Sequence, residues 1–318
     1  IRALSTAQVN ALTNGQLQAL SSAQVVALTT EQVQNLTTAN LNALTTEELA
    51  RFTTAQVRAL TTEQINNLST ANLAALGTAQ YAALTSDQVN AFTTGQVRSL
   101  ETADVRSITT AALAGLTSTQ VGALTTDGVQ ALTTGQIGAL NTDQFKGMTT
   151  ADMVALTSTQ VAALTSVQAA SLNTDQLRAI EVADVKAITT GDIRALDSAQ
   201  VNALTNSQLQ ALTSAQLVAL STTPQVSGLT TGNLNTLTTE QISRLTTAQV
   251  RALTTEQINN LSTANLAAMG TAQYAALTSD QVNAFTTGQV RSLETADVRS
   301  ITTAALAGLT STQVGALT

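Results

Sequence analysis

A period of eight residues runs through the whole chain and limits its fold more than any other feature. The consensus is L-T-T-A-Q-V-x-A, with positions labelled a to h. Position a falls at Leu4, recurs every eight residues to Leu220, and after one nine-residue repeat continues from Leu229 to Leu317. It is always Leu, Ile, Met or Phe, and position f is large and apolar except at Ala169. Positions a and f are therefore predicted to supply the core.

Neither a continuous helix nor a continuous strand can bury these two positions. At ~100° per residue, eight residues move position a by about 80° around a helix axis in every repeat, so no fixed apolar face forms. In a strand, positions a and f are separated by an odd number of residues and point to opposite faces. The chain must therefore change direction once in each repeat.

The sequence places this break at positions a and b. Position b is mostly Thr or Ser, and position e, three residues later, is usually Gln, which is the spacing of a capping box. The apolar residues at a and f have the spacing of a hydrophobic staple, as in Leu60 and Ile65. All 20 acidic residues lie at b, d or e and all 13 basic residues at g or h, the favoured ends of a helix. Each octad is predicted to be one N-capped helical turn over positions c to h, followed by a reversal.

Such short helices are unstable alone, because nucleation costs more than one turn returns. A cap adds only about 1 kcal/mol, so the a and f side chains must pack against those of neighbouring octads. We predict an all-α solenoid of about forty octapeptide repeats around a thin Leu/Val core. It is expected to be one continuous domain over residues 1–318, with two or three octads in each coil.

A longer repeat lies on top of the octads. Residues 53–125 and 246–318 differ at one of 73 positions, Leu76 against Met269, which indicates a recent duplication over 24 octads plus one inserted residue. The insertion lies at residues 221–224. Because Thr222 and Gln225 keep the capping spacing, the extra residue is predicted in the reversal, with Pro224 in the first helical turn. The chain begins and ends within a motif, so we expect an excerpt of a longer array.

Composition excludes several kinds of chemistry. The chain has no His and no Cys, hence no imidazole base, thiol nucleophile, disulfide or zinc site of the usual type. A net charge of −7 and scarce aromatic residues oppose nucleic-acid binding, and no apolar run reaches the ~20 residues of a membrane span. Near-identical octads give every carboxylate nearly the same surroundings, whereas acid–base catalysis needs two unlike ones. We therefore expect no enzyme, no catalytic, cofactor-binding or metal-binding residues, and no cofactor.

Some repeated residues allow more than one interpretation. Gln at position e, in 26 of 39 complete octads, is expected to serve capping rather than ligand binding. The dispersed acids are expected to be solvated. Calcium binding, only between octads or chains, is the less favoured alternative; the densest clusters are Glu47 with Glu48 and Glu101 with Asp104. Position g, the most variable, is expected to face solvent freely. Tyr81 and Tyr274, equivalent in the duplicated segments, are expected in the core.

The run TTAQVRALTTEQ, residues 53–64, carries a resemblance that covers the whole chain. It resembles the long, acidic, cysteine-free repetitive proteins of bacterial surfaces and secreted matrices, which implies an extracellular or cell-surface location. Uniformity of the repeats favours a non-catalytic structural protein that self-associates, end to end or laterally, into a filament, sheath or surface layer. The alternative hypothesis is the rigid stalk of a bacterial adhesin that presents a distal binding domain. A Thr array that binds ice is the third.

Overall fold

The computed structural model describes residues 1–318 and consists of short helices without any strand. There are 38 α-helices, each of four to six residues, and one π-helical segment, η1. The predicted all-α repeat fold is therefore confirmed. The chain divides into two compact units, Ile1–Ala163 and Leu164–Thr318. Continuity of a single solenoid from one unit to the next stays a prediction.

The helices of the first unit are α1 (Thr6–Asn10), α2 (Asn14–Gln18), α3 (Ser22–Val26), α4 (Thr30–Gln34), α5 (Thr38–Ala43), α6 (Thr46–Ala50), α7 (Thr54–Ala59), α8 (Thr62–Asn67), α9 (Thr70–Ala74), α10 (Thr78–Tyr81), α11 (Ser86–Asn90), α12 (Thr94–Arg98), α13 (Thr102–Ser107), α14 (Thr110–Leu113), α15 (Ser118–Val121), α16 (Thr126–Ala131), α17 (Thr134–Ala139), α18 (Thr142–Lys146), α19 (Thr150–Ala155) and α20 (Ser158–Val161). The helices of the second unit are α21 (Ser166–Ser171), α22 (Thr174–Ala179), α23 (Val182–Val185), α24 (Thr190–Ala195), α25 (Ser198–Ala203), α26 (Asn206–Ala211), α27 (Ser214–Ala219), η1 (Thr222–Val226), α28 (Thr231–Thr236), α29 (Thr239–Arg244), α30 (Thr247–Ala252), α31 (Thr255–Asn259), α32 (Thr263–Ala267), α33 (Thr271–Ala275), α34 (Ser279–Asn283), α35 (Thr287–Ser292), α36 (Thr295–Ser300), α37 (Thr303–Leu306) and α38 (Ser311–Val314).

Helix α7 shows how one octad folds. Thr53 is the N-cap, and its hydroxyl accepts the backbone N–H of Gln56 at 3.2 Å. The side-chain oxygen of Gln56 accepts the N–H of Thr53 at 2.7 Å, which completes the predicted capping box. The helix ends at Leu60, whose φ of −59° and ψ of 135° turn the chain into the next cap. The reversal thus lies at positions a and b, as predicted.

Burial in each unit follows the two apolar positions. At position f, Val57 and Ile65 are completely buried, and at position a, Leu60 and Leu68 are nearly so. Full burial of such a side chain contributes roughly 1.5–3 kcal/mol. This contribution is available only because neighbouring coils share one interior.

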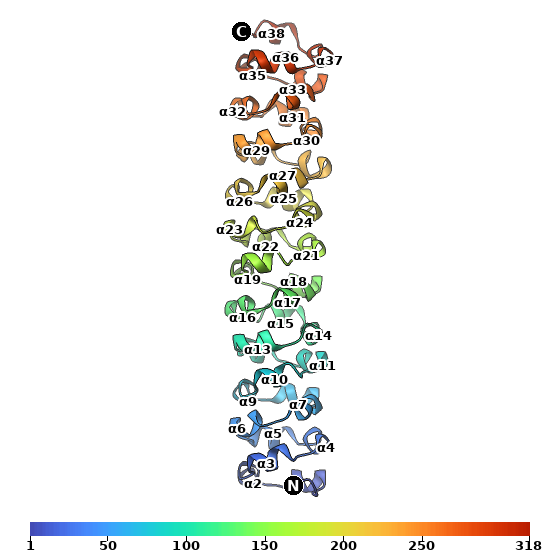
Figure 1. Cartoon of the computed structure of the whole chain (residues 1–318), viewed down its shortest axis with the longest axis vertical. Coiled ribbons are helices and arrows are strands. Elements are labelled where there is room, and N and C mark those ends of the chain that lie inside the picture. Colours follow the sequence, from blue (N-terminus) through green and yellow to red (C-terminus); the bar gives the residue numbers. More distant parts are fainter. The chain divides into compact units, whose positions relative to one another are not determined.

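Within each unit, a helix packs against the third helix before it and the third after it. Figure 1 shows α4 and α7 stacked on one side of the first unit and α6 and α9 on another. Side chains at position e reach carbonyl groups 28 and 31 residues earlier, at the end of the fourth helix back. A coil therefore contains between three and four octads, more than either predicted value.

The inserted residue is accommodated at the start of η1 by extended backbone at Thr223, and the predicted cap at Thr222 does not form. Ser221 remains the N-cap, and Gln225 accepts its N–H across four residues instead of three. Within η1, the N–H of Val226 bonds to the carbonyl of Ser221, and Thr223 has a non-helical φ of −135°. Val226 stays completely buried, in register with the other f positions.

Glycine at position h allows close contact between coils. A Cβ on Gly147, after α18, would overlap the backbone of Ser118 in α15, whereas a Cβ on Gly135 in α17 would meet nothing closer than 3.9 Å. We expect Gly147→Ala to lower the free energy of unfolding by about 1–3 kcal/mol. Gly135→Ala is expected to raise it by roughly 0.5–1 kcal/mol, because alanine favours the helix. Urea unfolding of both variants checks this; a stabilised Gly147→Ala protein would contradict the packing.

Candidate functional site

Glutamine at position e links each coil to the preceding one as well as capping its own helix. The Oε1 atom of Gln96 accepts the N–H of Thr93 at 2.7 Å, as predicted. Its Nε2 atom donates to the carbonyl oxygens of Ile65 at 2.8 Å and Leu68 at 2.7 Å. Gln96 is buried, so all three bonds are shielded from water. This second role was not predicted.

We call the residues that make such Nε2 bonds to an earlier coil the glutamine ladder. In the first unit they are Gln32, Gln56, Gln64, Gln80, Gln88, Gln96, Gln120, Gln136, Gln144 and Gln160. In the second they are Gln200, Gln208, Gln216, Gln225, Gln241, Gln249, Gln257, Gln273, Gln281, Gln289 and Gln313. Only a primary amide supplies both the acceptor and the two donors at this place.

Asparagine at position e requires help from the preceding coil. The side chain of Asn72 does not accept the N–H of Ser69, so this helix has no capping box. The Oδ1 atom of Asn42 accepts that N–H instead, at 2.9 Å. Asn72 in turn donates to Asn42 at 3.4 Å. The same arrangement links Asn10 to Asn40, Asn202 to Asn233 and Asn235 to Asn265. A signal for it was present in the sequence, because every Asn at e has an Asn at g thirty residues earlier, or thirty-one across the insertion.

Most amide side chains at position g bond to a later coil, which corrects the prediction that this position is free. Asn90 is exposed, yet its Nδ2 atom donates to the carbonyl oxygen of Gly115 at 2.7 Å. Asn66 bonds in the same way to Ala91, and Gln18 to Ala43, in each case 25 residues later. Asparagine and glutamine at position g therefore form a second, solvent-exposed set of links between coils.

Six octads have an acidic residue at e: Glu48, Asp104, Asp152, Asp184, Asp192 and Asp297. A carboxylate can accept the capping N–H but cannot donate to the coil beneath. At Asp104 a tyrosine supplies the donor, since the hydroxyl of Tyr81 bonds to the carbonyl of Leu73 at 2.9 Å. Leu73 lies 31 residues before Asp104, where a ladder glutamine would donate.

Tyr274 bonds to Leu266 at 2.7 Å in the same relation to Asp297. Both tyrosines are completely buried, so their predicted place in the core is confirmed. Burial, and to a smaller extent the nearby carboxylates, raises the pKa values of both tyrosines. Their hydroxyls therefore stay protonated and act as donors.

Burial raises the pKa of Asp104 from 3.8 to about 6; the hydrogen bond from the Glu101 N–H opposes this rise, and the Glu101 charge adds to it. Between these two pH values the folded state holds a proton that the unfolded chain releases, so this group destabilises the fold increasingly as pH rises from about 4 to 6. Relative to the unaltered chain, the stability of Asp104→Asn is expected to rise by on the order of 1 kcal/mol between pH 4 and pH 7, because asparagine carries no charge to bury. Urea unfolding at pH 4, 5, 6 and 7 measures this difference; a difference independent of pH would contradict it.

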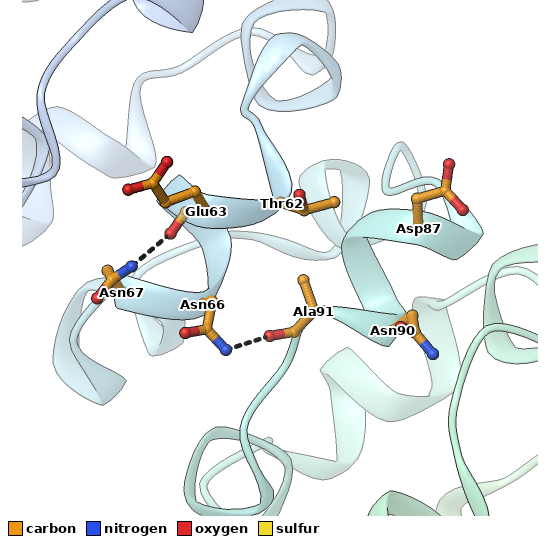
Figure 2. Close-up of a pocket in the computed structure, with 7 residues that line it drawn as sticks. All are labelled: Thr62, Glu63, Asn66, Asn67, Asp87, Asn90 and Ala91. Atoms are coloured by element: carbon orange, nitrogen blue, oxygen red, sulfur yellow. Dashed lines mark hydrogen bonds between the residues drawn. The ribbon is translucent and has the colours of Figure 1, made fainter.

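A surface hollow of about 520 Å³ lies between α8 and α11. Figure 2 shows that its asparagines are tied to the backbone: Asn66 donates to the carbonyl of Ala91, and Asn67 to that of Glu63. The carboxylates of Glu63 and Asp87 extend away from each other in this view. Nowhere in the chain do three acidic side chains come together in an arrangement that could hold a metal ion.

Comparison with known families now bears on this geometry. A family model for the ALTTAQ repeat matches residues 1–38, 36–70, 69–101, 97–134, 147–182, 177–214, 185–222, 226–263, 258–294 and 290–318. The chain belongs to the ALTTAQ repeat family. The six letters of ALTTAQ correspond to positions h to e, which contain the helix end, the reversal, the N-cap and the ladder glutamine, as in residues 131–136 (ALTTGQ). No curated protein sequence matches this chain.

The breaks between ALTTAQ matches include residues 223–225, which lie inside η1. No helix of this ALTTAQ protein is both long and apolar enough to cross a membrane.

Proposed function

We propose that this ALTTAQ repeat protein is a non-catalytic structural protein that forms or extends an extracellular filament, sheath or surface layer by self-association. The observation that carries the proposal is the glutamine ladder. In each unit, one coil binds the next through the same set of buried bonds. An array built in this way can lengthen without any new kind of contact, as expected for nearest-neighbour repeat proteins.

The first coil of the sequence shows which groups one coil presents to the coil before it. In residues 1–24, the amides of Gln8, Gln16 and Gln24 are exposed and the leucines at position a (Leu4, Leu12 and Leu20) are only half-buried. In later coils, the corresponding groups are buried against carbonyl oxygens and apolar side chains. Further repeats of the same chain, or the last coil of a second copy, could cover this face with the same bonds.

The uniform polar groups support the non-catalytic part of the proposal. The ladder amides at position e and most amides at position g are occupied by coil-to-coil bonds, and the ion pairs of Glu47 with Arg51 and of Glu240 with Arg244 lie on the exposed surface. The hydroxyls at position b accept N–H groups within their caps, so of the paired Thr rows only position c remains available to an ice surface. This favours a mechanical role over ice binding.

Electron microscopy and sedimentation of the 318-residue chain over a range of concentrations test the proposal. We expect particles that lengthen with concentration. The matched control is the triple variant Gln8→Glu, Gln16→Glu, Gln24→Glu, which keeps the capping oxygens but sets carboxylates against the carbonyls of an incoming coil. It should stay folded and fail to lengthen. Single elongated particles of the unaltered chain at every concentration would contradict self-association and favour the adhesin stalk.

A further inference from the structure

Glu48 in α6 interrupts the glutamine ladder in an unusual way. Its Oε2 atom accepts the N–H of Thr45 at 2.7 Å, just as a glutamine oxygen would. The residue is 7% exposed, and its second oxygen, Oε1, is buried and has no hydrogen-bond partner. It is the one buried side-chain polar atom left unpartnered in the structure.

The ladder register indicates what surrounds this oxygen. A ladder glutamine donates through Nε2 to carbonyl oxygens 28 and 31 residues earlier, which for position 48 are those of Leu20 and Leu17. In Glu48 the oxygen Oε1 takes the place of that nitrogen. By the ladder register it faces the carbonyl oxygens of Leu17 and Leu20 and has no hydrogen to donate to them. A buried carboxylate oxygen without a donor costs several kcal/mol unless a positive group compensates it.

Two other acidic residues at position e have a hydroxyl group at the place of the ladder bonds. The hydroxyl of Tyr81 donates to the carbonyl of Leu73, in the ladder register of Asp104, and the hydroxyl of Ser166 donates to Asp192 at 3.0 Å. Glu48 has no such neighbour on its Oε1 atom. Beside it lies a hollow of about 450 Å³ that Gln18, Leu20, Ser21, Ser22, Thr45, Glu47 and Arg51 also line. Arg51 is paired with Glu47 at 3.5 Å, so its charge is already balanced. The hollow gives a small ion a path to the site and adds the hydroxyl oxygens of Ser21 and Ser22.

We propose that Glu48 binds a calcium ion, with the carbonyl oxygens of Leu17 and Leu20 as further ligands and water completing the coordination. Calcium takes carboxylate and backbone carbonyl oxygens together and tolerates irregular geometry, whereas magnesium requires a near-ideal octahedron. One buried carboxylate and neutral oxygens fit a weak site, in the ~0.1–1 mM range of extracellular calcium modules. The site does not depend on the proposed self-association, because all its ligands come from one chain.

The test uses the full chain freed of metal, with CaCl2 as the probe and Glu48→Gln as the deciding variant. Glu48→Gln restores the ladder amide, so it should be more stable than the unaltered chain without calcium and should not respond to it. At about 10 mM CaCl2, ten times a 1 mM dissociation constant, the folding equilibrium constant of the unaltered chain should rise about tenfold, and calorimetry should detect binding.

Two controls separate calcium binding from other effects. Glu63→Gln removes an exposed carboxylate away from Glu48 and should keep the full calcium response. An equal response in Glu48→Gln would mean general screening of the negative charge and would overturn the proposal. So would an unaltered chain that ignores CaCl2 but is stabilised relative to Glu48→Gln when the pH falls, because a proton rather than calcium would then satisfy the oxygen.

Discussion

Replacing Val57 by aspartate is expected to disrupt the coils around α7 and to lower the free energy of unfolding by about 4 kcal/mol or more. Val57 is completely buried, and its neighbours in the shared interior are the apolar residues of positions a and f. None of them can pair with a carboxylate. Urea unfolding followed by circular dichroism measures the loss, and hydrogen exchange locates it in the coils that contact α7.

Asn90→Asp is the surface control for this substitution. Asn90 is exposed, and the change removes one solvent-exposed bond to the carbonyl of Gly115. We expect a loss of about 1 kcal/mol or less. Equal losses in Val57→Asp and Asn90→Asp would contradict the assignment of position f to the inside and position g to the outside.

Replacing Gln96 by glutamate is expected to lower the free energy of unfolding by roughly 3–5 kcal/mol, as found when a buried charge loses its partner. One carboxylate oxygen can still accept the N–H of Thr93. The other takes the place of Nε2 and faces the carbonyl oxygens of Ile65 and Leu68 without a hydrogen to share. Urea unfolding at pH 7 measures the effect, which should diminish when the carboxyl group is protonated at low pH.

Gln24→Glu is the matched control, because the same chemical change is made where no coil lies beneath. Gln24 is exposed and accepts the N–H of Ser21 at 2.8 Å, a bond that glutamate preserves. A negative charge in the first helical turn is slightly favourable, so stability should change by less than about 0.5 kcal/mol. If Gln96→Glu cost no more than Gln24→Glu, the ladder would contribute nothing to cohesion between coils.

The predictions that succeeded concern interactions within about eight residues. Thr53 and Gln56 lie three residues apart, so their capping box could be predicted from spacing alone. The burial of Val57 and Leu60 followed in the same way, because two apolar positions in each repeat have nowhere else to pack.

The errors arose where partners lie in another coil. Asn90 was expected to be free and Thr222 was expected to cap its helix, whereas Asn90 bonds to the carbonyl of Gly115 and Gln225 accepts the N–H of Ser221. The interpretation of glutamine at e was correct for Gln96 Oε1 and incomplete for Nε2.

The sequence by itself determined that each octad starts and ends a short helix and which two positions lie inside, because caps and staples act between near neighbours. Only the tertiary structure decided how many octads form a coil, and thus which residues meet 25, 28 or 31 positions apart. A strict period of eight looks the same at every multiple of eight, so it contains no measure of the coil's circumference; that length is set by how large the buried side chains are and how closely the helices pack.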